Sequence, residues 1–139
     1  MKLTAENRKI LVDEFEYAIK MMKTIDSAEK KLFYFSGLYG ALSRIFNLAY
    51  DPQLVFLHYI ISSAHTNINA RLAAIMKGGE TVIQFPEGYF DKLALIAEEL
   101  KEKIKKEEDT YSSMEKIAVM VFVTTGNGYY LYEKNIIKI

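Results

Sequence analysis

The sequence predicts a mainly α-helical fold: an antiparallel bundle of four to five helices, with a short extended or β segment near the C-terminus. Two observations lead to this prediction. Apolar residues recur at spacings of three and four along most of the 139 residues, which places them on one stripe of each helix. The connections between these stretches are short, as they are between antiparallel neighbours in a helical bundle.

The first predicted helix spans residues 4–23, and Thr4 is suited to cap its N-terminus. A second helix follows the cap residue Asp26 or Ser27. Its apolar stripe continues to Ala49. The first half of the chain is therefore expected to form two long rods joined by a short turn.

The third predicted helix has the clearest boundaries in the chain. Asp51 is a good N-cap, and Pro52 occupies the first helical position, where its missing N–H costs nothing. The helix continues to Lys77, with Gly78 as its left-handed C-cap. Its first half, Leu54–Ile61, is apolar nearly all round. Such a helix is expected to be central in the fold or covered by another subunit.

The fourth helix is expected to begin at Pro86, after an extended connection that includes either a short strand at Thr81–Phe85 or no regular structure. A fifth helix is predicted over residues 112–125, because Ser112 and Glu115 have the spacing of a capping box. An extended tail, Tyr129–Ile139, would follow it.

A β-hairpin is the alternative for this last part of the chain. Three β-branched residues, Val119, Val121 and Val123, alternate with other apolar residues. Asn127-Gly128 is a strong two-residue hairpin turn, and it precedes a tyrosine-rich stretch. The sequence leaves both possibilities open.

Composition favours one helical-bundle domain over residues 1–139 that associates with itself. Half of the residues are hydrophobic and 13% are aromatic, which is ample for the core of an ordinary domain. A monomer would struggle to cover all of this apolar surface. We therefore predict a homo-oligomer, in which the tyrosines near the C-terminus are suited to a subunit contact.

Charge and cysteine content restrict the other partners. Acidic and basic residues balance at 18 each, and there is no cysteine. Bulk charge does not direct the chain to nucleic acid or to an acidic membrane, and no apolar stretch reaches the ~20 residues that span a bilayer. Without a signal peptide at its start, we expect a soluble, cytoplasmic protein. Its use of Lys, Glu, Ile and Tyr would also suit a hot environment.

Four polar residues of the third helix, His58, Ser62, His65 and Asn69, fall within a narrow angular band. Such a band either lines a polar pocket between helices or consists of side chains satisfied by neighbours and solvent. The histidines are about 10 Å apart along the helix axis, too far to share one metal ion. No Glu-x-x-His pair of a di-iron bundle is present. We predict no metal site.

Arg44 and Arg71 are the other candidate binding residues, since both lie mid-helix among apolar neighbours. They are suited either to grip an anionic small-molecule ligand or to pair with a carboxylate across the bundle. No catalytic motif and no phosphate-binding glycine loop accompanies them. The identity of any cofactor and the question of an enzymatic activity therefore remain open.

The run 26–49 followed by 51–77 resembles, in helix length and order, the bundle of cobalamin adenosyltransferases and of uncharacterised archaeal proteins with that architecture. The resemblance covers residues 5–125 and concerns shape alone. It implies a helical bundle that forms dimers or trimers. The nucleotide loop and the arginine-rich helix motif of that enzyme family are missing here, since Asn69-Ala70-Arg71-Leu72-Ala73 lacks the clustered arginines and the acid. The resemblance therefore does not indicate an enzymatic activity.

These observations favour a self-associating structural or interaction protein. The alternative is a bundle that binds a small ligand or cofactor, with or without enzymatic activity, in a polar pocket on the third helix. A further alternative is a subunit of a larger assembly, whose apolar face receives a different protein.

Overall fold

The computed structural model describes residues 1–79 and 84–139, and within these ranges it contains helices and no strand. The predicted mainly α class is confirmed. Of the expected strand at Thr81–Phe85, residues 81–83 lie outside the described residues, and the last two are not in a strand. The helices are α1 (Ala5–Thr24), α2 (Ala28–Ser36), α3 (Leu38–Phe46), α4 (Pro52–Met76), α5 (Tyr89–Lys105), α6 (Tyr111–Val123) and α7 (Gly126–Glu133).

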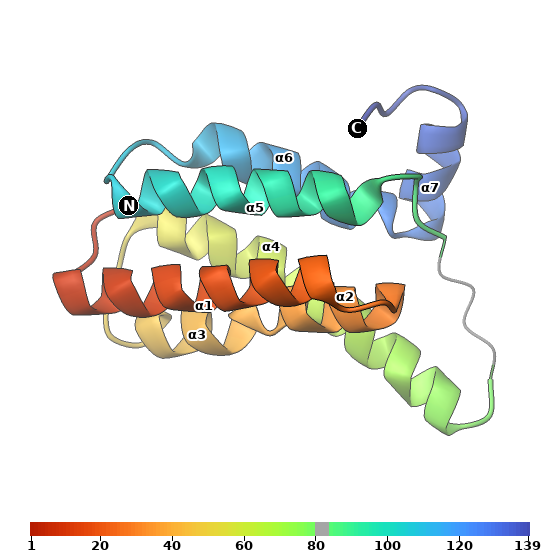
Figure 1. Ribbon diagram of the computed structural model, residues 1–139, viewed down its shortest axis with the longest axis horizontal. Helices are drawn as coiled ribbons and strands as arrows, with labels where there is room; N and C mark the ends of the chain where they lie inside the picture. The colour runs from red at the N-terminus through yellow and green to blue at the C-terminus, as the bar shows by residue number, and fades with distance from the viewer. Residues whose placement is uncertain (80–83) are drawn as a thin grey trace.

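Figure 1 shows α1 lying along α5, with α2 and α3 on the other flank of α1 and α6 beyond α5. Helix α4 contacts α2, α3 and α6. The helices share one connected apolar core, to which Phe15, Phe35, Leu57 and Leu100 contribute fully buried side chains. The last turns of α4 extend past the other helices, at the lower right of Figure 1, and Met76 at its end is 87% exposed.

Three of the predicted helix boundaries are confirmed by their hydrogen bonds and backbone angles. The hydroxyl of Thr4 accepts a hydrogen bond from the backbone N–H of Asn7 at 3.1 Å, and that of Ser27 accepts one from Lys30 at 3.4 Å. Gly78 has a φ angle of 78°, the left-handed conformation expected after the end of α4.

Asp51 caps α4 as predicted and also holds the N-terminal segment. Its carboxylate accepts hydrogen bonds from the backbone N–H groups of Gln53 and Leu54 at 2.8 and 3.3 Å, and from Lys2 at 2.9 Å. Burial alone would raise the pKa of this carboxyl, but these three donors and the N-terminal ammonium together lower it. Gln53 in turn accepts from the backbone N–H of Thr110 at 3.2 Å. The starts of α4 and α6 therefore meet at one polar junction.

The prediction of one continuous helix up to Ala49 is wrong, because the chain breaks at Gly37 into α2 and α3. The hydroxyl of Ser36 donates to the carbonyl of Phe33 at 2.9 Å, and the backbone N–H of Gly37 donates to the same carbonyl at 3.0 Å. A serine that competes for backbone groups and a glycine with low helix propensity together explain the interruption.

Two predicted starts are displaced. Helix α5 begins after Gly88, whose φ of 69° reverses the chain direction, and not at Pro86. Helix α6 begins one residue before Ser112, and its N-cap residue makes no side-chain cap bond. The capping box is therefore absent. The next serine, Ser113, is buried and donates to Glu99 of α5 at 2.7 Å, so this part of the sequence joins two helices.

The extended tail predicted for Tyr129–Ile139 is wrong in its first part, because Gly126–Glu133 forms α7. The hairpin alternative is wrong in both strands, which lie in α6 and α7. The Thr125 hydroxyl caps this helix by accepting from the backbone N–H of Gly128 at 3.0 Å. A Cβ atom on Gly128 would lie 2.0 Å from the carbonyl oxygen of Phe122. This glycine therefore permits close backbone approach at the α6–α7 corner, and does not serve a hairpin turn.

Candidate functional site

The six residues predicted to line a ligand pocket do not come together. His58, His65 and Asn69 lie along the α3–α4 contact, Arg44 pairs with α1, and Arg71 meets the α6–α7 corner. Ser62 is half-buried on α4.

His58 joins α4 to α3. Its ring stacks on Phe46 with centroids 5.1 Å apart and lies 5.5 Å from the ring of Tyr39. Its Nε2 atom is 3.3 Å from the hydroxyl oxygen of Ser43, within hydrogen-bonding distance. The imidazole therefore has neighbours on α3 for both its ring surface and its polar edge.

His65 continues the same row of rings one heptad later. It stacks on Tyr39 with centroids 4.4 Å apart and planes inclined by 13°, and the amide nitrogen of Asn69 lies 3.3 Å from its ring nitrogens. Stacked aromatic and imidazole rings of this kind stabilise a helix contact. The two histidines thus fit the alternative of side chains satisfied by neighbouring residues.

Arg44 forms an ion pair with Glu14 of α1 at 3.1 Å, and its side chain is mostly exposed. This is the cross-helix pairing that the sequence left open as one of two alternatives. The pair connects α3 to α1 on the surface of the protein, where such an interaction contributes little stability.

Arg71 is the most unusual of the six residues. Its Nη2 atom donates to the carbonyl oxygen of Thr124 at 2.7 Å, while its buried Nη1 atom has no hydrogen-bond partner among the described residues. Burial lowers the pKa of the guanidinium, and the nearby Tyr89 and Glu29 oppose that shift. A cavity of about 370 Å³ lies beside it, lined by α4 and by Thr124, Thr125 and Gly126.

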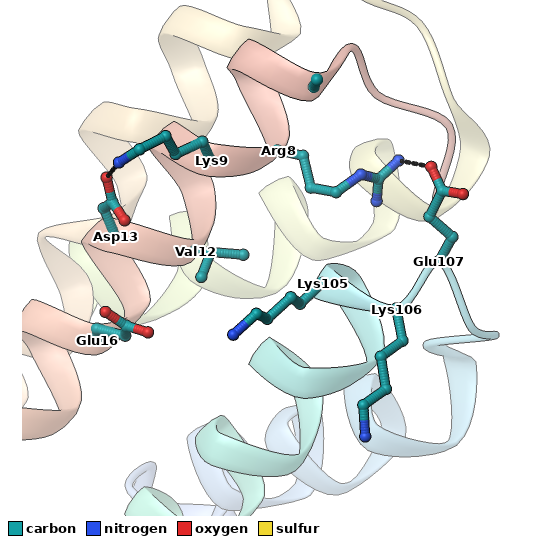
Figure 2. Close-up of a pocket in the computed structure, with 9 residues that line it drawn as sticks. Arg8, Lys9, Val12, Asp13, Glu16, Lys105, Lys106 and Glu107 are labelled. Atoms are coloured by element: carbon teal, nitrogen blue, oxygen red, sulfur yellow. Dashed lines mark hydrogen bonds and ion pairs between the residues drawn. The ribbon is translucent and has the colours of Figure 1, made fainter.

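A larger hollow, of about 560 Å³, lies between α1 and the end of α5 (Figure 2). It is lined by charges of both signs, which include the ion pairs of Arg8 with Glu107 at 2.8 Å and of Lys9 with Asp13 at 2.5 Å. Arg8 also donates to the carbonyl oxygen of Ile104 at 2.6 Å. The bonds of Arg8 tie α1 to the end of α5 and to the loop after it, and the mixed lining offers no charge of one sign to a ligand.

A further candidate site is the outward face of α4, whose exposed aromatic residues are not among the six predicted residues. From Pro52 to Ala70 this helix contains no Asp, Glu, Lys or Arg. Two aromatic side chains stand on it, Phe56 at 38% exposure and Tyr59 at 68%. The Phe56 ring lies 6.1 Å from that of Tyr111 on α6.

A groove runs beside this face, between α4 and α6. Its volume is about 320 Å³, and its walls are apolar or carry uncharged polar groups: Ile60, Ser63, Asn67, Ala118, Val121, Phe122 and Thr125. An exposed helix face and an adjoining groove, both without charge, are typical of a surface that contacts another protein.

Two further properties of residues 1–79 and 84–139 bear on function. No helix there has the length and apolar character needed to cross a membrane. No three of their histidine, aspartate and glutamate side chains gather in a group able to hold a metal ion.

Comparison with known proteins finds no family model, no curated protein and no solved structure that matches the chain. The resemblance of the predicted helices to the cobalamin adenosyltransferase bundle therefore stays a prediction.

Proposed function

We propose that this chain is a self-associating structural or interaction protein, an antiparallel helical bundle that binds a second copy of itself through the outward face of α4 and the groove beside α6. The observation that carries the proposal is the charge-free, aromatic face of α4 between Pro52 and Ala70.

The physical argument concerns what exposed helix faces normally carry. A helix on the surface of a globular protein places charged and polar residues on its outer face, and charged residues are depleted at the centres of protein interfaces. Burying Phe56 and Tyr59 against a partner removes apolar surface from water without removing a charge from water. The face is therefore better suited to contact with protein than to contact with solvent.

The solution mass tests this proposal. Sedimentation equilibrium at tens of micromolar should give a multiple of the 16.0 kDa chain mass. Tyr59→Lys should shift the protein toward monomer, because a lysine in the interface would have to lose its hydration. The matched control is Leu95→Lys on α5, since both side chains are 68% exposed. A monomer of the unsubstituted chain at these concentrations would refute the proposal.

Binding of a small anionic ligand at Arg71 is a second candidate function, favoured by the unpartnered Nη1 atom and the adjacent cavity. A ligand that binds only the folded state raises its apparent stability. Thermal unfolding in increasing inorganic phosphate or acetate should then show stabilisation of the unsubstituted chain and none of Arg71→Met. Equal responses of the two proteins would restrict Arg71 to its structural contact with Thr124.

A further inference from the structure

We infer that two copies of the chain pair through α4 in antiparallel orientation, about a twofold axis that passes between Ser63 and Thr66. This inference rests on the self-association proposed above and specifies its geometry. It adds which segment of the second copy lies against which residues.

The exposed positions of α4 follow a heptad pattern. Residues separated alternately by three and four positions are all exposed: Phe56, Tyr59, Ser63, Thr66, Ala70 and Ala73. This alternation is the spacing of the seam at which two helices of a coiled coil meet. Here the seam faces away from the core of its own chain, so a helix that packs along it would come from another molecule.

The sizes of the seam residues change along the helix, and they change in a way that suits self-pairing. The first half carries Phe56 and Tyr59, whereas the second half carries Ala70 and Ala73. An antiparallel copy places Phe56 opposite the partner's Ala73 and Tyr59 opposite the partner's Ala70. Every large side chain then meets a small one, which keeps the distance between the two helix axes even along the contact.

A parallel pairing does not have this property. It would place each aromatic ring against its own copy and each alanine against an alanine, so the helices would be held apart at one end and leave a gap at the other. It would also align the two helix dipoles, whereas antiparallel helices bring opposite ends together.

Two more features favour a second copy over a different protein. The large and small residues of the seam lie at equal distances from its midpoint, Phe56 with Ala73 and Tyr59 with Ala70. They therefore match when the seam meets a second copy of itself, as a twofold interface requires. The face also carries no Asp, Glu, Lys or Arg from Pro52 to Ala70, so self-pairing there opposes no like charges. The last turns of α4 extend past the other helices in Figure 1 and are accessible to the partner.

A size exchange tests the pairing directly. Tyr59→Ala leaves a cavity and Ala70→Tyr creates a clash of two rings, so each alone should weaken dimerisation about tenfold or more. The double variant Tyr59→Ala/Ala70→Tyr restores a large residue opposite a small one, and its dissociation constant should return to within about threefold of the original. Additive weakening in the double variant would overturn the antiparallel register. Circular dichroism of each variant checks that the helices are retained.

Disulfide trapping gives an independent measurement, because the chain has no native cysteine. Oxidation of Tyr59→Cys mixed with Ala70→Cys should give linked dimers, since the two positions would lie within disulfide range. Either variant alone should not link, because like positions would be about 16 Å apart along the axis. If Ala70→Cys linked to itself, the pair would be parallel. If the protein were dimeric but the mixture did not link, the interface would lie elsewhere. Both outcomes overturn the antiparallel register and leave self-association standing. A monomeric unsubstituted chain would overturn both proposals.

Discussion

Helices α4 and α5 pack into the same core but face the solvent in different ways. Both bury apolar residues completely, for example Leu57 on α4 and Leu100 on α5. Helix α5 carries eight acidic or basic residues among seventeen, whereas α4 carries one, Arg71, among twenty-five. The inner faces are therefore alike, and the outer faces differ.

Several charges of α5 pair within the chain. Lys101 is surrounded by the carboxylates of Glu16, Glu98 and Glu102. Its hydrogen bond to Glu98 raises the pKa of its ammonium although burial opposes that shift. Because many charges of α5 are paired on its surface, and α4 carries none from Pro52 to Ala70, the outer faces of the two helices suit different surroundings, and the face of α4 is the one that we propose for assembly.

The largest expected effects come from the inner faces, where the two helices should behave alike. Leu57→Ala and Leu100→Ala each remove a fully buried side chain, and each should lower the free energy of unfolding by about 2–5 kcal/mol. Urea titrations at one protein concentration would measure both losses. A loss below about 1 kcal/mol for Leu57→Ala alone would show that α4 is not part of the common core.

The N-termini of the two helices should differ. Asp51→Ala removes the cap of α4 and the bond to the Lys2 backbone, so it should cost about 1–3 kcal/mol. The control, Asp91→Ala, removes an exposed acidic residue from the first turn of α5 and should cost about 0.3–1 kcal/mol. Equal losses in urea unfolding would contradict the role assigned to the Asp51 junction.

The sequence was sufficient to predict the helical class and the helix ends that depend on local chemistry. Thr4, Asp51 and Gly78 act within one turn of their own position, so their roles follow from residue type and spacing. Gly37 and Gly128 were different. The apolar stripe continues on both sides of Gly37, so periodicity does not show the break there, and the role of Gly128 depends on the close backbone of Phe122 at the α6–α7 corner. The alternating valines of α6 likewise became helical, since β propensity depends strongly on context.

The candidate site was harder to predict than the fold. The band of His58, His65 and Asn69 was correctly placed on one helix, but periodicity does not show which neighbour covers a helix face. Tyr39 and Phe46 cover that band from α3. The uncharged stretch from Pro52 to Ala70 is visible in the sequence, but its exposure becomes evident only when the core is known.

A smaller effect on stability is expected from the polar contacts that Glu99 of α5 makes. Hydrogen bonds from Ser113, Lys116 and Lys103 lower the pKa of Glu99 from 4.5 to about 2. A depressed pKa in the folded state contributes stability above the unfolded pKa, and this contribution is lost as the pH falls from 4.5 to 2. Glu99→Gln should therefore lower stability at pH 7 by less than about 1 kcal/mol, because the pairs are solvent-screened.

The difference between the unsubstituted chain and Glu99→Gln should also disappear as the pH approaches 2, which acid titration of unfolding would measure. The matched control is Glu108→Gln, which replaces an exposed carboxylate in the loop after α5. A Glu99→Gln difference that persisted unchanged at pH 2 would mean that its ionisation is not linked to folding.

The smallest effect is expected for the response of the dimer to salt, because the proposed contact between α4 seams involves no ion pair. Salt screens interactions between exposed charges, with a Debye length of about 10 Å at 0.1 M and about 3 Å at 1 M. Contact between α4 seams involves no ion pair, so the dissociation constant of the dimer should change less than about threefold between these concentrations of NaCl. Sulfate, which is excluded from protein surfaces, should tighten the dimer instead. A dissociation constant that rose steeply with NaCl would assign assembly to a charged face, such as that of α5, and would reverse the comparison between the two helices.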